Sequence, residues 1–326
     1  MNQQAKDNID ILDKNNYKIN KDLLEILLFD HSTNENIRWC TNNYKRYGNE
    51  YSFSEPILSS LIIGKHGNII KPRSSKSSLE KKIRVKEKAE VFTPSWTCNL
   101  QNNQVDDIWF EKKNVFNSSQ NLAWKTNYNK IEFGNKSWID YVNDKRIEIT
   151  CGEAPYVVSR YDTVSGNPIN VADRVGILDR KIRIINENST NLEWYDNVLK
   201  AYKSVYGFEW QGDSLLIARK NLLYTFIDYY LNRFDSMPDT LKLKEIAKVI
   251  SWNFFQMDGV KGVIPESCNN QKVVQIDLFG KEVTEKCSGC ENNLLHKHNG
   301  IYALIKDWDH DKTIKFIELV SRRIHI

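Results

Sequence analysis

The chain of 326 residues is 40% hydrophobic and 27% charged, and its formal net charge at pH 7 is +4. These values are typical of a globular protein with one large domain or a domain that carries additions, and so small a net charge does not by itself indicate nucleic-acid binding. No apolar run approaches the roughly 18 residues that a transmembrane helix needs, and the polar N-terminus lacks the apolar core of a signal peptide. We therefore expect a cytoplasmic protein with no membrane partner.

The N-terminal part of the chain is expected to form an extension. The apolar sequence DLLEILLFD at 22–30 predicts a short helix, and alternation over 36–70, with Gly64 and Gly67 in a turn, predicts strands. The stretch 71–88 holds eight Lys or Arg against two Glu and is expected to end in a helix. Its charge has two interpretations: a solvated helix face, or a surface that contacts the phosphates of DNA.

From residue 93 to residue 255 the sequence predicts helices that alternate with strands. Helix starts are indicated by capping residues, and in one case by a Thr N-cap with Pro94 at the first helical position. These starts are Thr93 with Pro94, Ser137 with Asp140, and Thr190 with Glu193. The further predicted elements are strands at 146–151, 205–210 and 249–255, helices at 213–234 and 240–250, and a loop at 103–135. This alternation predicts an α/β fold with a mainly parallel sheet.

The carboxyl ends of the predicted strands carry the strongest functional signal. Glu209 ends a short apolar run, and an acidic residue at that place can accept hydrogen bonds from the ribose hydroxyls of a nucleoside. Gly152 follows another strand and would let the backbone approach a ligand closely. Asp258 follows the third predicted strand, where it could accept from an adenine amino group. Glu209 could also be an ordinary surface acid, but together these positions predict a nucleoside-binding crevice.

Four stretches at these positions resemble the adenine-N6 DNA methyltransferases that use S-adenosylmethionine. They are AEVFTP at 89–94, EITCGEAPY at 148–156, YGFEW with LLIARKNLL at 206–223, and the apolar run that ends in Asp258. From about residue 35 the chain also looks like a group labelled "restriction endonuclease subunit M", through AEVFTPSW, EITCGEAPY and HNGIY. The resemblance implies a Rossmann-like methyltransferase sheet, a role in restriction–modification, DNA as a partner and a restriction endonuclease as a further partner.

The resemblance also implies a set of cofactor-binding residues: Phe92, Thr93, Pro94, Glu148, Thr150, Cys151, Gly152, Glu209, Trp210 and Asp258. Thr150 and Glu153 depart from the small residues usual in the family. The family transfers the methyl group at an (Asp/Asn/Ser)-Pro-Pro-(Tyr/Phe/Trp) tetrapeptide, but this sequence has no Pro-Pro pair, and no catalytic residue can be named. Two alternatives stay open: an inactive methyltransferase fold that serves as a DNA-binding or regulatory subunit, and a methyltransferase for another acceptor such as RNA or protein.

Three cysteines near the C-terminus suggest a structural zinc site. Cys287 and Cys290 form a Cys-x-x-Cys pair, and with Cys268 and one histidine they would supply four tetrahedral ligands. His296 is the predicted fourth ligand, with His298 as the alternative, and free thiols are the other interpretation. The predicted organisation is an N-terminal extension at 1–88, a methyltransferase-like cofactor domain at 89–264 and a zinc-stapled C-terminal element at 265–326.

Overall fold

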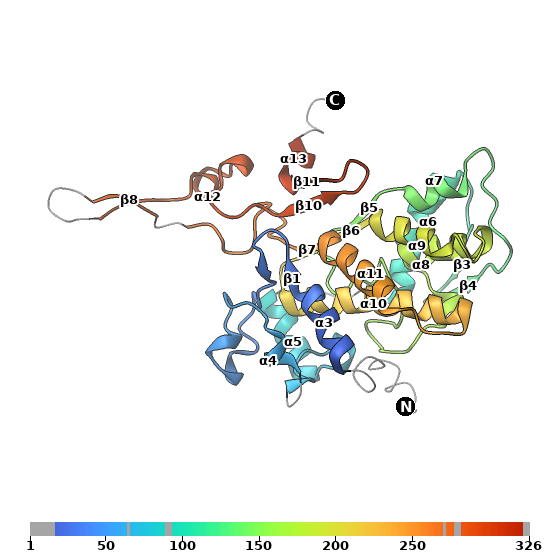
Figure 1. Ribbon diagram of the computed structural model, residues 1–326, viewed down its shortest axis with the longest axis horizontal. Helices are drawn as coiled ribbons and strands as arrows, with labels where there is room; N and C mark the ends of the chain where they lie inside the picture. Colours follow the sequence, from blue (N-terminus) through green and yellow to red (C-terminus); the bar gives the residue numbers. More distant parts are fainter. Residues whose placement is uncertain (1–16, 64–65, 89–92, 270–271, 277–281, 322–326) are drawn as a thin grey trace.

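The computed structural model describes residues 17–63, 66–88, 93–269, 272–276 and 282–321 (Figure 1). Within these residues helices combine with small sheets, so the predicted α/β class is confirmed at that level. The largest sheet has three strands, and the other four are two-stranded antiparallel pairs. No helix in these ranges combines the length and the apolarity required to cross a membrane.

A parallel sheet in the order β5-β6-β7 organises the middle of the chain. Its strands are β5 (Arg146–Glu148), β6 (Val205–Glu209) and β7 (Phe254–Gln256). All five residues of β6 are buried, because β6 lies between the other two strands and has a layer on each face. Two of the predicted strands are thus confirmed in their first parts, at 146–148 and 205–209.

Helices cover one face of this sheet. Before β6 the chain forms η5 (Val171–Asp173), α8 (Ile177–Asn188) and α9 (Trp194–Lys203), and after it α10 (Gly212–Phe234) and α11 (Thr240–Asn253). Sixteen of the 23 residues of α10 are buried, which is typical of a helix inside the core rather than on its surface. Both helices predicted after β6 are confirmed. Because α11 continues to Asn253, the strand predicted from residue 249 begins only at Phe254.

The C-terminal hairpin covers the other face of the sheet. β10 (Leu304–Asp307) pairs antiparallel with β11 (Lys312–Lys315), and α13 (Phe316–Ser321) follows. Side chains alternate along a strand, so Tyr206 and Phe208 of β6 point away from the helices. An apolar cluster forms there from Tyr206, Phe208, Phe255, Met257, Ala303 and Ile305, with Phe316 packed against it. The sheet is therefore the middle of three layers.

The strands predicted at 36–70 are wrong for the described residues beyond Asn36. The extension instead contains α3 (Tyr17–Leu28), β1 (Phe29–Asp30), β2 (Glu35–Asn36), η1 (Lys45–Tyr47), η2 (Asn49–Tyr51), α4 (Ser59–Ile62), η4 (Arg73–Ser75) and α5 (Ser78–Lys88). The ring centroid of Trp39 lies 4.6 Å from that of Tyr44, in a compact aromatic group. The side chain of Gln256 bonds both the N–H and the carbonyl oxygen of Arg38, and an isolated antiparallel bridge joins Arg38 to Pro56, so this segment is held without a regular strand. Both predicted helices of the extension are confirmed, as α3 and α5.

The loop predicted at 103–135 begins inside a helix. The region contains α6 (Ser95–Phe110), β3 (Asn117–Gln120), β4 (Ala123–Thr126) and, after it, α7 (Trp138–Asn143). The buried face of α6 is polar: Asn99 and Asp106 both accept hydrogen bonds from the guanidinium of Arg180. A search for apolar periodicity misses such a helix, because its core-facing side chains are amides and carboxylates.

Local helix starts agree with the sequence to within a residue or two. The capping box of Ser137 and Asp140 is confirmed. Pro94 is the N-cap of α6 rather than its first residue. The hydroxyl of Thr190 accepts from the N–H of Glu193, and α9 begins directly after this pair.

Between the sheet and the C-terminal hairpin the chain forms an arm. It contains β8 (Lys272–Ile276), β9 (Glu282–Glu285), α12 (Ser288–Asn292) and η6 (Leu295–Lys297), and β8 pairs antiparallel with β9. In Figure 1 the strand pair projects from the body, with α12 nearer to its base. The alternation of helices with parallel strands therefore ends at β7.

Candidate functional site

Three acidic side chains lie where the strands of the parallel sheet end. Glu148 ends β5, Glu209 ends β6, and Asp258 follows β7 by two residues. Their exposed fractions are 8%, 8% and 5%. Because the strands are parallel, this is the edge at which an α/β sheet presents loops and carboxylates to a ligand. The structure thus brings three of the sequence-predicted residues to one edge.

The carboxylate of Glu209 connects the ends of β5 and β6. Its Oε2 accepts from the N–H of Gly152 at 2.8 Å, and its Oε1 accepts from the N–H of Gln211 at 3.2 Å. Burial raises the pKa of Glu209, and these N–H groups offset part of the rise. Burial also raises the pKa of Glu148 well above its ordinary value, and the charge of Glu209 adds to that rise. The pKa of Glu148 therefore depends on the charge of Glu209 at this edge.

The turn after β5 has a left-handed backbone at three positions. The φ angles of Thr150, Gly152 and Ala154 are 52°, 54° and 61°, values that are strained for all but the glycine. Cys151 is 1% exposed, its N–H donates to the carbonyl of Phe208 at 2.8 Å, and burial raises the pKa of its thiol. Cys151 therefore packs the turn against β6, while Thr150 lies at the surface.

Thr93 and Pro94 lie against the loop that follows β5. The carbonyl of Thr93 accepts from the hydroxyl of Thr163 at 2.9 Å, and the next N–H, of Ser95, donates to Asp162 at 2.7 Å. The start of α6 is thus fixed against residues 162–163 of that loop. Phe92, predicted with these residues to contact the cofactor, lies outside the described residues.

Asp258 and Trp210 occupy the ends of the neighbouring strands. Oδ1 of Asp258 accepts from the N–H groups of Val260 and Lys261 at 3.0 and 3.2 Å, and Nζ of Lys261 lies 3.6 Å from Oδ2. This carboxylate therefore closes its own turn. The carbonyl of Trp210 accepts from Gln256 at 2.8 Å, which fixes the strand end and leaves the indole partly exposed.

Glu153, where the resembled family has a small residue, anchors the basic segment to this edge. Its side chain is buried, with 1% exposed. Oε1 accepts from the N–H of Arg73 at 2.7 Å, and Oε2 accepts from the hydroxyl of Tyr161 at 2.8 Å. The unusual glutamate thus holds the segment that precedes α5.

The contact between α5 and the end of β6 is not predicted by any pattern in the sequence. Arg84 donates to Gln211 at 3.2 Å and to Asp213 at 2.8 Å. Gln211 and Asp213 stand two and four positions after Glu209, so position alone could have marked them as residues of the edge. Their partner is far away in the sequence and no spacing rule would identify it.

Three cysteines and a histidine build a second site, in the C-terminal element. Nδ1 of His298 lies 3.6 Å from Sγ of Cys268, 3.7 Å from Sγ of Cys287 and 3.6 Å from Sγ of Cys290. All four ligand atoms lie within 4.8 Å of one another. Zinc–sulfur bonds of about 2.3 Å and zinc–nitrogen bonds of about 2.0 Å at tetrahedral angles separate sulfur from nitrogen by roughly 3.6 Å. The cluster could therefore bind a metal such as zinc.

The fourth member of this cluster is His298, and the prediction of His296 is corrected. His296 lies within η6, whereas His298 follows it as the C-cap and brings its ring to the cysteines. A Cβ at Gly289 would lie 2.6 Å from the backbone nitrogen of His298, so only glycine permits this approach. Sequence spacing predicts the three cysteines but cannot separate two histidines two residues apart, because the local backbone direction decides between them.

The thiols of the cluster differ in acidity. Burial opposes ionisation of Cys287, but N–H groups, among them that of Asn299 at 3.4 Å, lower its pKa to about 6. Burial and the neighbouring thiols raise the pKa of Cys268 to about 12. Three thiolates side by side would repel one another, so Cys268 is held as a thiol, and a bound cation would remove that repulsion.

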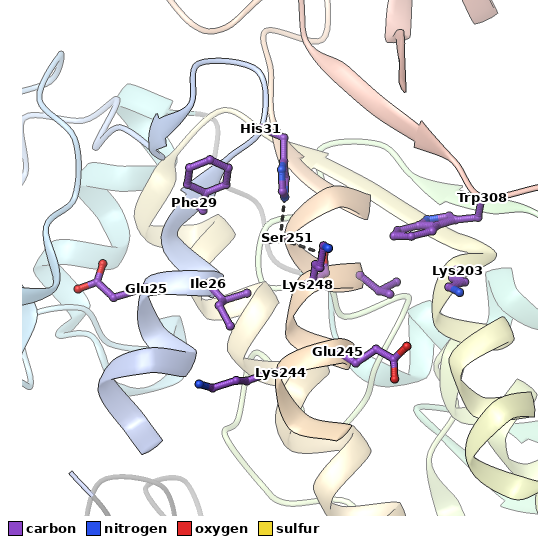
Figure 2. A pocket seen from close by; sticks show the side chains of 11 residues that line it. Glu25, Ile26, Phe29, His31, Lys203, Lys244, Glu245, Lys248, Ser251 and Trp308 are labelled. Carbon is purple, nitrogen blue, oxygen red and sulfur yellow. Dashed lines mark hydrogen bonds between the residues drawn. The ribbon is translucent and has the colours of Figure 1, made fainter. Parts of the chain in front are cut away.

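A groove of about 710 Å³ lies at the opposite edge of the sheet, between α3 and α11 (Figure 2). Lys203 precedes β6 and Ser251 precedes β7, so the groove faces the amino ends of these strands. His31 Nε2 lies 2.9 Å from the Ser251 hydroxyl, and burial, Arg219 and Lys248 lower the pKa of His31 to about 3. The groove thus has a neutral imidazole and a mainly apolar wall. It lies at the opposite edge of the sheet from the three acidic side chains.

Comparison with known proteins identifies no relative: the chain matches no protein-family model, no curated protein and no solved structure. The functional assignment therefore depends on two arrangements of side chains. One is the acidic edge of the parallel sheet, with Glu209 fixed between two loops. The other is the cluster of three cysteines and His298.

Proposed function

We propose that this chain binds S-adenosylmethionine at the carboxyl edge of β5, β6 and β7 and is a DNA methyltransferase-like protein of a restriction–modification system, with adenine as its expected target base. The observation that carries the proposal is the carboxylate of Glu209, which is held at the end of the middle strand beside the Gly152 turn. A Rossmann-like methyltransferase sheet is part of this proposal.

The proposal is supported by the chemistry of Glu209 and of the turn at Gly152. A carboxylate has about four acceptor positions, and Glu209 uses only part of them on the N–H groups of Gly152 and Gln211. Acidic residues at this strand position accept from ribose hydroxyls in nucleotide-binding sheets. The left-handed turn at Gly152 places a backbone without a Cβ next to the same carboxylate, so a ligand can approach closely.

Calorimetric titration of the protein with S-adenosylmethionine tests the proposal. We expect wild type to bind, and Glu209→Gln to lose about tenfold or more, because a charge-assisted hydrogen bond contributes about 1.5–3 kcal/mol. Glu132→Gln is the matched control, since that side chain is 85% exposed and lies away from the edge. Melting temperatures of all three proteins show whether they are folded. A folded wild type that binds no cofactor at millimolar concentration would refute the proposal.

A second candidate is an inactive methyltransferase fold that acts as a DNA-binding or regulatory subunit. It is favoured by one sequence observation, the lack of any Pro-Pro pair to hold a flipped adenine. Transfer of a labelled methyl group to mixed DNA, RNA and protein separates the candidates. Label in DNA supports the enzyme, label in RNA or protein identifies another acceptor, and cofactor binding without any transfer supports the inactive subunit.

A further inference from the structure

A polar pocket of about 440 Å³ lies at the start of α5, and Arg84 of its wall donates to Gln211 after the end of β6. Arg46, Lys71, Lys76 and Arg84 contribute to its wall, which also contains the carboxylate of Glu80. Asp213 lies behind the wall, where it accepts from Arg84. Four cations against two carboxylates leave an excess of two positive charges around one concave site.

Lys76 is the unusual member of this wall. Only 7% of its side chain is exposed, and its ammonium group has no hydrogen-bond partner among the described residues. The nearest carboxylate oxygen, Oδ2 of Asp213, is 3.9 Å away and already accepts from Arg84 and from the hydroxyl of Tyr44, each at 2.8 Å. A buried ammonium with three unused donors is costly unless an acceptor joins it.

The first turn of α5 borders the same pocket. Ser77 caps this helix: its hydroxyl accepts from the N–H of Glu80, and the Glu80 carboxylate accepts from the N–H of Ser77 at 2.9 Å. Oε2 of Glu80 is therefore used by the cap, while Oε1 lies 3.9 Å from a guanidinium nitrogen of Arg46. The positive end of a helix of 11 residues favours an anion at this place, and it acts in the same direction as the buried ammonium.

We propose that this pocket binds a phosphate group of a nucleic-acid backbone. A phosphate supplies several acceptor oxygens to Lys76 and to the guanidinium of Arg46, and it matches the excess positive charge. The half-exposed ring of Tyr47 beside Arg46 provides a surface for an adjoining base.

The position of the pocket suggests what it serves. Arg84 belongs to its wall and donates to Gln211, whose N–H donates to the carboxylate of Glu209. A phosphate held at Lys76 would therefore lie beside the proposed cofactor edge. The phosphate assignment depends on the pocket alone, whereas the choice of nucleic acid as its source rests on the proposed function.

Two binding measurements on the full chain test the inference, both without S-adenosylmethionine. Fluorescence anisotropy follows labelled single- and double-stranded DNA of about 20 nucleotides over a range of salt concentrations. Calorimetry follows inorganic phosphate. We expect Lys76→Met to weaken DNA binding about tenfold and to reduce the slope of log K against log salt by about 0.9, the value for one phosphate contact.

Lys86→Met is the matched control, because Lys86 is an exposed lysine of α5 outside the pocket wall. Arg46→Gln is a second test variant: this side chain is 67% exposed, so its replacement tests the pocket even if Lys76→Met lowers the melting temperature. Equal losses in the Lys76, Arg46 and Lys86 variants would show a general surface charge and overturn the pocket. Binding of inorganic phosphate without any binding of DNA would overturn the nucleic-acid source. Cofactor binding is measured in the separate titration with S-adenosylmethionine, so its failure is distinguishable from a failure of phosphate binding.

Discussion

Arg84 and Asp213 form an ion pair of 2.8 Å, with only 4% and 0% of their side chains exposed. The pair joins α5 of the N-terminal extension to the first turn of α10, across 129 positions of sequence. The hydroxyl of Tyr44 donates to the same oxygen of Asp213 at 2.8 Å. The basic segment is therefore bound to the end of β6 by buried charge, and the extension is a structural part of the acidic edge.

Asp213→Asn is expected to lower the free energy of unfolding by about 3–5 kcal/mol, because it leaves the buried Arg84 guanidinium without a compensating charge. Equilibrium unfolding in urea measures this change. The exposed pair Lys112–Glu132 supplies the control, and Glu132→Gln should change stability by less than about 0.5 kcal/mol. Equal effects of the two substitutions would contradict the prediction.

The same pair predicts a pH dependence. Burial opposes ionisation of Asp213, but Arg84 and Lys76 lower its pKa to about 2 from an ordinary value of 3.8. A carboxylate with a depressed pKa in the folded state contributes stability above its unfolded pKa and loses it as pH falls through the folded value. The stability difference between wild type and Asp213→Asn should therefore shrink by about 2 kcal/mol from about pH 5 to pH 2. Urea titrations at successive pH values measure it, and a constant difference would show that Asp213 titrates normally.

The sequence predicts those parts of the fold in which apolar pattern and burial agree. The apolar run that forms β6 and the long periodic stretch that forms α10 are examples, because both lie inside the core. The helix α6 is a counterexample, since the side chains of Asn99 and Asp106 are buried against Arg180. Burial of paired polar groups depends on the partner, and Arg180 is 74 positions from Asp106 and 81 from Asn99, too distant for any local pattern to show.

The candidate sites show the same limit. Strand ends and cysteine spacing led to Glu209 and to the three thiols, because both signals are local. The partner of Asp213 and the choice of His298 depend on how distant segments meet, which spacing does not encode. Glu153 was recognised as a departure from a family pattern, but its function as an anchor for Arg73 became visible only in three dimensions.

Glu153→Ala is expected to loosen the loop that precedes α5. The substitution removes the acceptor for the Arg73 N–H and for the Tyr161 hydroxyl, and leaving such buried groups unpaired costs about 1–3 kcal/mol each. Hydrogen exchange of the peptide 71–77 should become faster than in wild type. Glu153→Gln keeps one carbonyl oxygen in place and should give a smaller increase. Unchanged exchange in the alanine variant would mean that other contacts hold this loop.

Arg219→Met should be among the most destabilising single changes in the described chain. The guanidinium donates to four backbone carbonyls, those of Leu27, Phe29, Ser251 and Phe254, at 2.6 to 3.1 Å. It therefore ties α3 and β1 to the end of α11 and to β7. We expect a loss of at least about 3 kcal/mol in urea unfolding, with a smaller loss for Arg219→Lys, which restores part of the donors. Equal stability of the methionine variant and wild type would contradict this function of Arg219.

The protein purified without chelator is expected to carry about one zinc ion per chain. His298→Ala and Cys287→Ser should each reduce the zinc content strongly, because both remove a ligand atom from the cluster. His296→Ala is the matched control and should keep the metal, since that histidine is outside the cluster. Metal analysis by emission spectroscopy gives the content. Equal losses in the two histidine variants would contradict the assignment of His298.

The same variants test whether the metal stabilises the fold. The cluster joins Cys268, which follows the sheet, to His298, which precedes the hairpin covering the apolar face. Removing zinc should therefore detach the hairpin first, and a chelator should lower the melting temperature of wild type and of His296→Ala but not of His298→Ala. Zinc release should increase as pH falls, because the ligands must be deprotonated to bind. A wild type whose melting temperature does not respond to the chelator, although it loses its zinc, would show that direct contacts with the body, such as the packing of Ile305 and the hydrogen bond from the Trp308 indole to Asn253, hold the hairpin without the metal.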